Sequence, residues 1–261
     1  MNRLCLKLIT LGLLLVLPVL PGCSKEKEII TSLEQLAGKT FAVPTGTAAD
    51  KLVLSKFPNA QFQYYNSVLD AAMAVKIGKA DAAAYDEPIL KNIAAKNGGL
   101  AVLSDMLTVD NYAVAVEKEN HQLKMAIDSV IAELKTNGSY DAMMQRWFPK
   151  SGTPRALAEP SPSDSADVIK LGTAPITEPF SFVDGSQRVV GFDIELAQQV
   201  AQKLGKRLEI VTMDFGAMIP ALMAGKVDMI AACITVTEER KQKVLFSEPY
   251  YVGGIAALVR R

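Results

Sequence analysis

Two stretches of the chain place a chemically active residue at the same point of a similar pattern. Both "MAVKIGKADAAAYD" and "PALMAGKVDMIAAC" read as a helix, then Gly-Lys-x-Asp, then a strand, with Asp81 and Asp228 in equivalent positions. Five residues beyond each aspartate, at the carboxyl end of the strand, stand Asp86 and Cys233. Ligands of open α/β sheets bind outside those strand ends. The pattern therefore predicts two similar lobes whose strand ends face each other across a cleft.

Few side chains remain for catalysis or metal binding. His121, in "EKENHQLK", is the only histidine and is typical of a solvated surface residue. It is the one remote candidate for a Ser-His-Asp triad, and a histidine-rich metal site is excluded. Cys5 and Cys23 lie at the start of the chain, so Cys233 stands alone, without a disulfide framework. The chain has no glycine-rich phosphate loop, and we expect neither a metal nor a cofactor.

The elements that must position these residues alternate between β-rich and helical runs. Alternation of this kind predicts an α/β fold with mostly parallel sheets. Pro88 suits a first helical turn, whereas Gly98 and Gly205 suit helix ends. The expected strands are "TFAVP" (40–44), "FQYY" (62–65), "AAAY" (82–85), "YAVAVE" (112–117), "VIKLGT" (168–173), "RLEIVTM" (207–213), "VDMIAAC" (227–233) and the run at 255–259.

Two segments fall outside this alternation. Residues 149–167, "PKSGTPRALAEPSPSDSAD", have no apolar periodicity and are predicted to be a linker. Residues 1–23 combine a basic start with an apolar run of 13 residues (8–20), which indicates a signal peptide. They end in Leu-Pro-Gly-Cys23, which resembles the lipobox of bacterial lipoproteins. Acylation of Cys23 would anchor the domain to a membrane at the cell surface or in the periplasm; the alternative is an ordinary cleaved signal.

Charge argues against one class of partner. The chain has 28 basic and 28 acidic residues, and this zero formal charge gives no electrostatic reason to expect nucleic-acid binding.

Three quoted stretches carry a family resemblance. They are "GFDIELAQQVAQKLG", "MDFGAMIPALMAGKVDMIAACITVTEERKQKVLFSEPYY" and "LAGKTFAVPTGTAAD…GKADAAAYDEP". They resemble the polar amino-acid-binding proteins of bacterial ABC importers, the extracellular solute-binding proteins of family 3. The resemblance covers nearly the whole chain from residue 33. It implies a two-lobed type II periplasmic-binding-protein fold that closes like a Venus flytrap around a free amino acid, polar or charged, and delivers it to the membrane components of an importer.

The order of the segments differs from that of the family. There the "KLGTAP…GFDIELA" part comes first and runs through "FSEPYYVGGIAALVRR" into "SLEQLAGKTFAVPTGT", whereas here the halves are exchanged. This order predicts a circular permutation in a monomer; the alternative is a domain-swapped dimer. Runs 112–116 and 255–259 resemble the two strands that cross between lobes at the hinge. The expected parts are 33–111 as lobe 2, 112–148 as the returning part of lobe 1, 149–167 as linker, and 168–261 as the main part of lobe 1, which ends in a hinge strand.

The resemblance also assigns binding roles. Arg240 and Thr235 would take the carboxylate of the amino acid, and Thr47 would join them when the lobes close. Asp86, from the opposite lobe, would pair with the ammonium, which would also donate to the backbone carbonyl of Cys233. Each side chain has a local alternative: a solvated charge at a helix start for Arg240, a capping acid for Asp86 and an N-cap for Thr47.

The side-chain subsite is less well defined. Phe215 matches an aromatic that packs on the ligand side chain, although it could equally be a core residue. Family members commonly carry an acid at the position of Ala174 and an aromatic at that of Thr177. We interpret Glu178 as a residue that faces the pocket and favours a cationic or hydrogen-bonding ligand.

Two other functions remain open on the same scaffold. Relatives include dehydratases that act on cyclohexadienyl substrates, and such an enzyme would need a general acid, for which Glu178 is the obvious candidate. A ligand-sensing module is the second. We expect a binding protein and not an enzyme.

Overall fold

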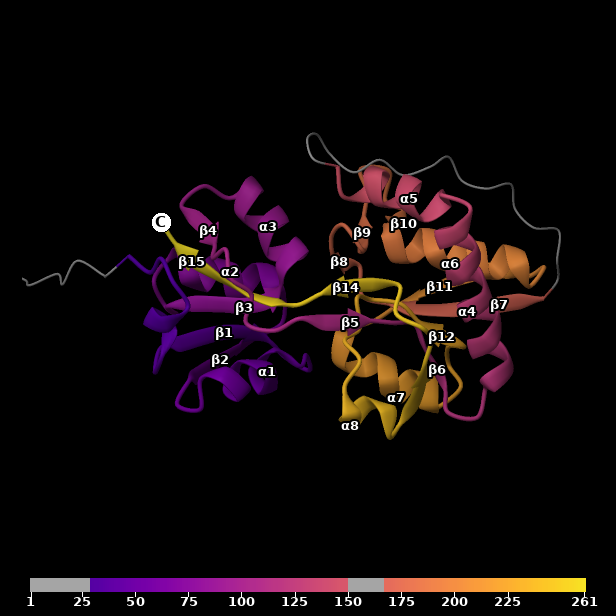
Figure 1. Ribbon diagram of the computed structural model, residues 1–261, viewed down its shortest axis with the longest axis horizontal. Helices are drawn as coiled ribbons and strands as arrows, with labels where there is room; N and C mark the ends of the chain where they lie inside the picture. The colour runs from indigo at the N-terminus through magenta and orange to yellow at the C-terminus, as the bar shows by residue number, and fades with distance from the viewer. Residues whose placement is uncertain (1–28, 150–166) are drawn as a thin grey trace, which may run out of the picture.

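The computed structural model describes residues 29–149 and 167–261. They form two α/β lobes that lie next to each other, joined by strands in the centre of Figure 1. The predicted signal peptide, the lipobox Cys23 and all but the ends of the linker lie outside the described residues. Within the two described ranges, no helix combines the length and the apolar character needed to cross a bilayer.

Lobe 2 is built on a five-stranded sheet with the order β2-β1-β3-β15-β4. Strands β1, β2 and β3 are parallel, whereas β15 runs antiparallel to both β3 and β4. The strands are β1 (Thr40–Pro44), β2 (Gln61–Tyr65), β3 (Ala82–Asp86), β4 (Leu100–Val102) and β15 (Ile255–Arg260). The helices are η1 (Glu34–Leu36), α1 (Ala49–Lys56), α2 (Val68–Lys76) and α3 (Glu87–Lys96).

Lobe 1 has its own five-stranded sheet, with the order β11-β7-β12-β6-β13. Its strands are β6 (Ala115–Glu117), β7 (Val168–Thr173), β11 (Arg207–Thr212), β12 (Met229–Ile230) and β13 (Val244–Phe246). A small sheet of β8 (Ile176–Thr177), β9 (Ser181–Val183) and β10 (Val189–Val190) adjoins it. The helices are α4 (His121–Thr136), α5 (Ser139–Trp147), α6 (Phe192–Lys203), η2 (Phe215–Ala217), α7 (Met218–Met223) and α8 (Glu238–Lys241).

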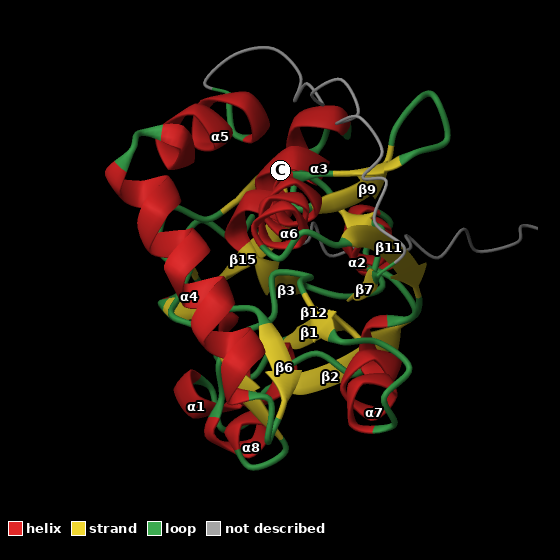
Figure 2. Cartoon of the chain, turned by 90° about the vertical axis from the view of Figure 1, so that its right-hand side faces the viewer, coloured by secondary structure: helices red, strands yellow, loops and turns green. Residues whose placement is uncertain are grey.

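Helices α4 and α5 fix the returning segment to lobe 1. In Figure 2, α4 runs along one side of this lobe and α5 lies across its end. Arg146 of α5 donates two hydrogen bonds to the Glu195 carboxylate of α6, with N···O distances of 3.1 and 2.8 Å, and Trp147 Nε1 donates a third at 2.6 Å. A half-buried bidentate pair of this kind is stronger than an exposed one, so α5 and α6 are held together by specific contacts as well as apolar packing.

Two short antiparallel strands connect the lobes. Strand β5 (Asp110–Tyr112) pairs with β14 (Tyr251–Gly253), with Tyr112 opposite Tyr251. The crossing therefore lies a few residues before the predicted run 255–259, which is strand β15 in the interior of the lobe 2 sheet. Because β15 is buried along nearly all its length and hydrogen-bonds on both edges, it belongs to the core of lobe 2.

Glycine is required where the crossing strand passes Tyr112. A Cβ atom added to Gly253 would lie 2.6 Å from the Tyr112 hydroxyl oxygen, and one added to Gly254 would lie 2.0 Å from the carbonyl oxygen of Thr108. Both distances are far below van der Waals contact, so the Gly-Gly pair allows the two crossing segments to approach closely.

Helix ends agree with the local sequence in most places. Ser67 caps α2 by accepting from the Asp70 N–H, and the Gly205 backbone has φ +64° just after α6, as predicted for a helix end. Pro88 lies in the first turn of α3 as expected. After α3, however, the residue with positive φ is Gly99 and not Gly98.

Candidate functional site

A pocket lies between the lobes and is lined by both. Its empty volume is about 240 Å³ when the open solvent at its mouth is included. Lobe 2 contributes Thr47, Ala48, Ala49, Tyr85, Asp86 and Ile255, and lobe 1 contributes Phe215, Cys233, Thr235 and Arg240. Six of the seven residues predicted to bind ligand are in this lining. The seventh, Glu178, is outside it and pairs with Lys96 of α3.

Asp86 is the acidic group of the pocket. It ends β3, is 4% exposed, and accepts a hydrogen bond at Oδ1 from the Tyr112 hydroxyl; Oδ2 lies 3.8 Å from the Cys233 sulfur. Its side chain makes no capping hydrogen bond to α3, contrary to the capping alternative. Burial raises the pKa of Asp86 to about 7, because the carboxylate loses hydration. A bound cation would stabilise the charged form.

Arg240 is the cationic group on the opposite wall. Its Nη1 donates to the Thr235 carbonyl at 2.9 Å, and its guanidinium carbon lies 5.5 Å from the centroid of the Phe215 ring. The side chain is partly buried, which argues against a purely solvated charge, and burial lowers its pKa from the usual value. A guanidinium held in this way offers a planar pair of donors to a carboxylate.

Thr47 lies at the start of α1, on the lobe 2 side of the pocket. The Thr47 hydroxyl donates to the Pro44 carbonyl at 2.9 Å and accepts from the Ala49 N–H at 3.4 Å, so it stabilises the turn that begins α1. Beside it, a Cβ added to Gly46 would lie 2.9 Å from the Cα of Gly216. The backbones of the two lobes therefore approach each other directly at this point.

The backbone of Cys233, which lines the pocket, is held in place by a buried acid. The residue has φ +43°, a conformation rare outside glycine, and its N–H donates to Asp193 Oδ2 at 2.8 Å. Asp193 is fully buried at the start of α6, and burial raises its pKa to about 7. Its other oxygen has no hydrogen-bond partner among the described residues. Asp193 thus fixes the loop that carries Cys233.

Sequence reasoning missed two of these supporting residues, Asp193 and Tyr112. Asp193 did leave a signal, because it falls on the same helix face as the apolar Leu196, Ala197 and Val200. An acid on an apolar face requires a buried partner. A tyrosine at the start of an apolar strand gives no comparable signal.

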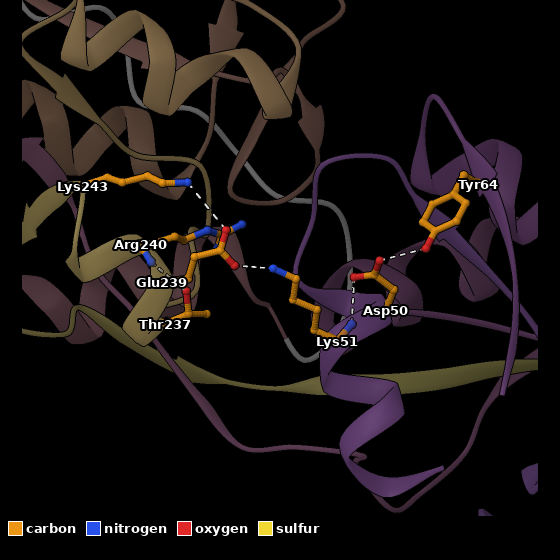
Figure 3. A network of polar contacts seen from close by, with 7 residues as sticks. All are labelled: Asp50, Lys51, Tyr64, Thr237, Glu239, Arg240 and Lys243. Carbon is orange, nitrogen blue, oxygen red and sulfur yellow. Dashed lines mark hydrogen bonds and ion pairs between the residues drawn. The ribbon is translucent and has the colours of Figure 1, made fainter. Parts of the chain in front are cut away.

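An exposed ion-pair network joins the two lobes next to segments that line the pocket. Figure 3 shows Lys51 of α1 in lobe 2 paired with Glu239 of α8 in lobe 1, next to Arg240. Glu239 is also 3.6 Å from Lys243, and the hydrogen bond that it accepts from Lys51 lowers its pKa. On the Lys51 side, Asp50 accepts from the Tyr64 hydroxyl at 2.9 Å. Together with Lys96 and Glu178, this network gives two ion pairs that connect the lobes.

Known proteins resemble one part of the chain. Residues 169–261 match the family described as bacterial extracellular solute-binding proteins, family 3. Among curated relatives, a probable histidine-binding protein of Campylobacter jejuni is 44% identical over 85 residues, which are 33% of each chain. The arginine-binding extracellular protein ArtP of Bacillus subtilis is 42% identical over 84 residues, or 32% of each chain. The L-cystine-binding protein TcyJ of Escherichia coli K12 is 37% identical over 90 residues, 34% of this chain and 33% of that protein. The chain thus spans about a third of the length of the curated relatives that it matches.

Solved structures match a similar share. An ancestral arginine-binding protein bound to arginine is 48% identical and covers 32% of this chain and 37% of its own, with a TM-score of 0.32. The arginine-bound domain 1 of TmArgBP is 41% identical, covering 36% and 80% of the two chains, also with a TM-score of 0.32. The similarity to the bacterial extracellular solute-binding proteins, family 3, thus covers residues 169–261, which include Phe215, Cys233, Thr235 and Arg240 of the pocket.

Proposed function

We propose that the protein binds a free amino acid in the pocket between its lobes and delivers it to an ABC importer. The observation that carries this proposal is the pairing of Arg240 and Asp86, which line one pocket from opposite lobes. The carboxylate of an amino acid would pair with the partly buried Arg240, and its ammonium would pair with the buried Asp86. The names of the relatives, which bind histidine, arginine and cystine, support the same ligand class.

The mechanism follows from the division of the pocket. Arg240 and Thr235 bind the carboxylate from lobe 1, while Asp86 binds the ammonium from lobe 2. Thr47, also on lobe 2, joins the groups that bind the carboxylate when the lobes close. The β5–β14 crossing permits the lobes to close as a hinge, which removes the ligand from water and strengthens both charge pairs. Binding energy is therefore shared by the lobes, and closure depends on the ligand.

We also propose that the chain is a circularly permuted monomer, lipid-anchored outside the cytoplasmic membrane through Cys23. Two features support the permutation: β15 completes the lobe 2 sheet, and residues 112–148 pack against the helices of lobe 1. A mass in light scattering that stays monomeric at all concentrations would support it against the domain-swapped dimer. An acylated N-terminal cysteine in the mass spectrum of the mature protein would support the anchor.

The enzyme alternative is weaker. Family members and relatives named above are binding proteins, and the one candidate acid, Glu178, forms an ion pair with Lys96 outside the pocket lining. A sensing role would use the same pocket and differs only in the partner.

Thermal unfolding with each of the twenty amino acids tests the proposal. We expect one or a few to raise the Tm without being converted, and isothermal calorimetry then gives the Kd. In Arg240→Ala, affinity should fall at least about 30-fold, since roughly 2 kcal/mol or more is lost when a ligand charge is left unpaired. Arg188→Ala is the control, because Arg188 pairs with Asp184 outside the pocket lining. Unchanged affinity in Arg240→Ala, or no hit in the panel, contradicts the proposal.

A further inference from the structure

Tyr112 lies on the crossing strand β5, and its hydroxyl contacts the acid that lines the pocket, Asp86. It is fully buried at the end of β5, and its ring stacks on Tyr251 of β14 with centroids 5.6 Å apart. Its hydroxyl donates to Asp86 Oδ1 and accepts from the Gly254 N–H at 3.2 Å. The residue is not in the pocket lining, so any effect on a ligand must act through its neighbours.

The hydroxyl has a single available orientation. A tyrosine hydroxyl has one proton to donate, and here its oxygen already accepts from Gly254, so the proton points at Asp86. The carbonyl of the same Gly254 accepts from the N–H of Glu87, the residue after Asp86, at 3.0 Å. The crossing strand therefore holds both the tyrosine hydroxyl and the backbone next to the acid.

We propose that Tyr112 is a positioning residue for the ammonium subsite: it orients the Asp86 carboxylate and connects it to the crossing strand at Gly254. This inference rests on the proposed function, because the subsite is the one assigned to the amino-acid ammonium. Tyr112 need not touch the ligand. It acts by keeping one oxygen of Asp86 occupied and leaving the other directed toward Cys233 and the pocket.

The charged and titratable groups around Asp86 set the expected pH dependence. They are Tyr85 on β3, Asp110 and Tyr112 on β5, Tyr251 on β14, Asp193 on α6, Cys233 in the loop after β12 and Arg240 on α8. Burial raises the pKa of Asp86 to about 7; the Tyr112 hydrogen bond and the charge of Arg240 lower it, and Asp110 raises it. Without the hydroxyl, the pKa of Asp86 must rise further. The acid would then be neutral at a pH where the wild type is charged.

The test substitutes Tyr112→Phe, which keeps the stacked ring and removes only the hydroxyl. The first measurement is the titration of the Asp86 carboxyl carbon by NMR in ligand-free protein, assigned with Asp86→Asn. We expect its midpoint to move to higher pH. The second is calorimetry, between pH 6 and 9, with the amino acid that gives the largest Tm rise in the panel of twenty. Affinity should fall about tenfold at pH 7 and recover as the pH rises and Asp86 ionises.

Tyr140→Phe is the matched control. The Tyr140 hydroxyl donates to the Tyr250 carbonyl at 2.6 Å and makes no hydrogen bond to Asp86, so its loss should leave the Asp86 midpoint unchanged. If Tyr112→Phe does not fold, 3-fluorotyrosine at position 112 replaces it. Its hydroxyl is a stronger proton donor of nearly the same size, and it should move the midpoint to lower pH.

The outcomes are separable. An Asp86 midpoint that does not move overturns the role of Tyr112, and so does an affinity loss that is equal at every pH, because that indicates only a structural defect. If wild type binds none of the twenty amino acids, the proposed function fails, while the titration still reports on Tyr112.

Discussion

The two lobes use the same helix–turn–strand unit, and they differ at the point where that unit meets the pocket. In lobe 2, α2 is followed by Gly78 at φ +79° and β3; in lobe 1, α7 is followed by Gly225 at φ +66° and β12. The aspartate after each turn hydrogen-bonds the neighbouring parallel strand. Asp81 Oδ2 accepts from the Thr40 N–H at 3.0 Å, and Asp228 Oδ2 accepts from the Lys170 N–H at 2.7 Å. The shared unit thus fixes the register of each sheet.

The ends of the two strands carry different chemistry. β3 stays extended to Asp86, where Ile255 of β15 pairs with it, and it offers a side-chain charge. β12 ends at Ile230, and the chain then turns. The N–H of Cys233, which has φ +43°, donates to the carboxylate of Asp193 in α6. One lobe therefore exposes an acid to the pocket, while the other uses an acid to hold a backbone loop. A buried carboxylate thus lines the pocket in one lobe and holds a backbone loop in the other.

The largest expected effect is the dependence of folding stability on pH, to which both buried acids contribute. The pKa of both Asp86 and Asp193 is raised in the folded state to about 7 from an ordinary value of 3.8, so the folded protein holds more protons than the unfolded chain between these pH values. Stability therefore falls as pH rises from about 4 to 7, by at most about 4 kcal/mol for each group. Urea unfolding of the ligand-free protein at pH 5 and pH 8 measures it.

Asp86→Asn and Asp193→Asn should each reduce that pH dependence, but with different results for the ligand. Asp86→Asn removes the proposed partner of the ligand ammonium and should abolish binding in a protein at least as stable at pH 8. Asp193→Asn should retain measurable binding, weakened through the Cys233 loop. Glu238→Gln, whose side chain is 86% exposed, is the control and should change neither quantity. Equal loss of binding in both variants would contradict the division of roles.

An intermediate effect is expected where the lobes meet at Gly46. In Gly46→Ala, the new methyl group would collide with the Gly216 backbone at 2.9 Å, so closure should be hindered and affinity should fall about tenfold. Gly38→Ala is matched to it, since Gly38 also has positive φ, +68°, but a Cβ there meets nothing within 4 Å. Both should cost about 1 kcal/mol of folding stability. If calorimetry shows the same affinity in the two variants, the glycine contact does not limit closure.

The smallest effect concerns the exposed ion pair between Lys51 and Glu239. Lys51→Ala removes the exposed contact with Glu239 and should weaken binding by only a few fold at low salt. The difference from wild type should vanish in 0.5 M salt, because exposed charges are screened. Lys241→Ala, which breaks a pair with Glu238 within α8, should have no such effect. A loss that persists at high salt would mean that Lys51 does more than pair with Glu239.

Much of the fold could be predicted because its elements follow local patterns. Predicted runs 40–44 and 168–173 have the same bounds as β1 and β7, and the pattern of Gly78 and Gly225 does recur in space. Strands β8–β10 were missed, since runs of two or three residues show no periodicity. The expected strand 227–233 shortens to Met229–Ile230 because the chain turns before Cys233.

The site residues could be predicted only where they lie in the sequence stretches that resemble the family. Arg240, Thr235, Cys233, Phe215, Asp86 and Thr47 were expected together, and all six line the pocket. Glu178 was expected to face the ligand, yet Lys96, 82 positions away in sequence, pairs with it. Tyr112 and Asp193 act through contacts that exist only after the lobes and crossing strands assemble. A pattern along the chain carries no information on such contacts.

The position of β15 has a consequence for synthesis on the ribosome. Its neighbours β3 and β4 are translated long before it, so during elongation the lobe 2 sheet has two open edges where the strand belongs. Open edges of apolar strands are templates for wrong pairing, and chaperones commonly protect them. The sheet of lobe 2 therefore stays incomplete while almost all of lobe 1 is synthesised, and we expect wrong pairing at these edges to compete with folding in that interval.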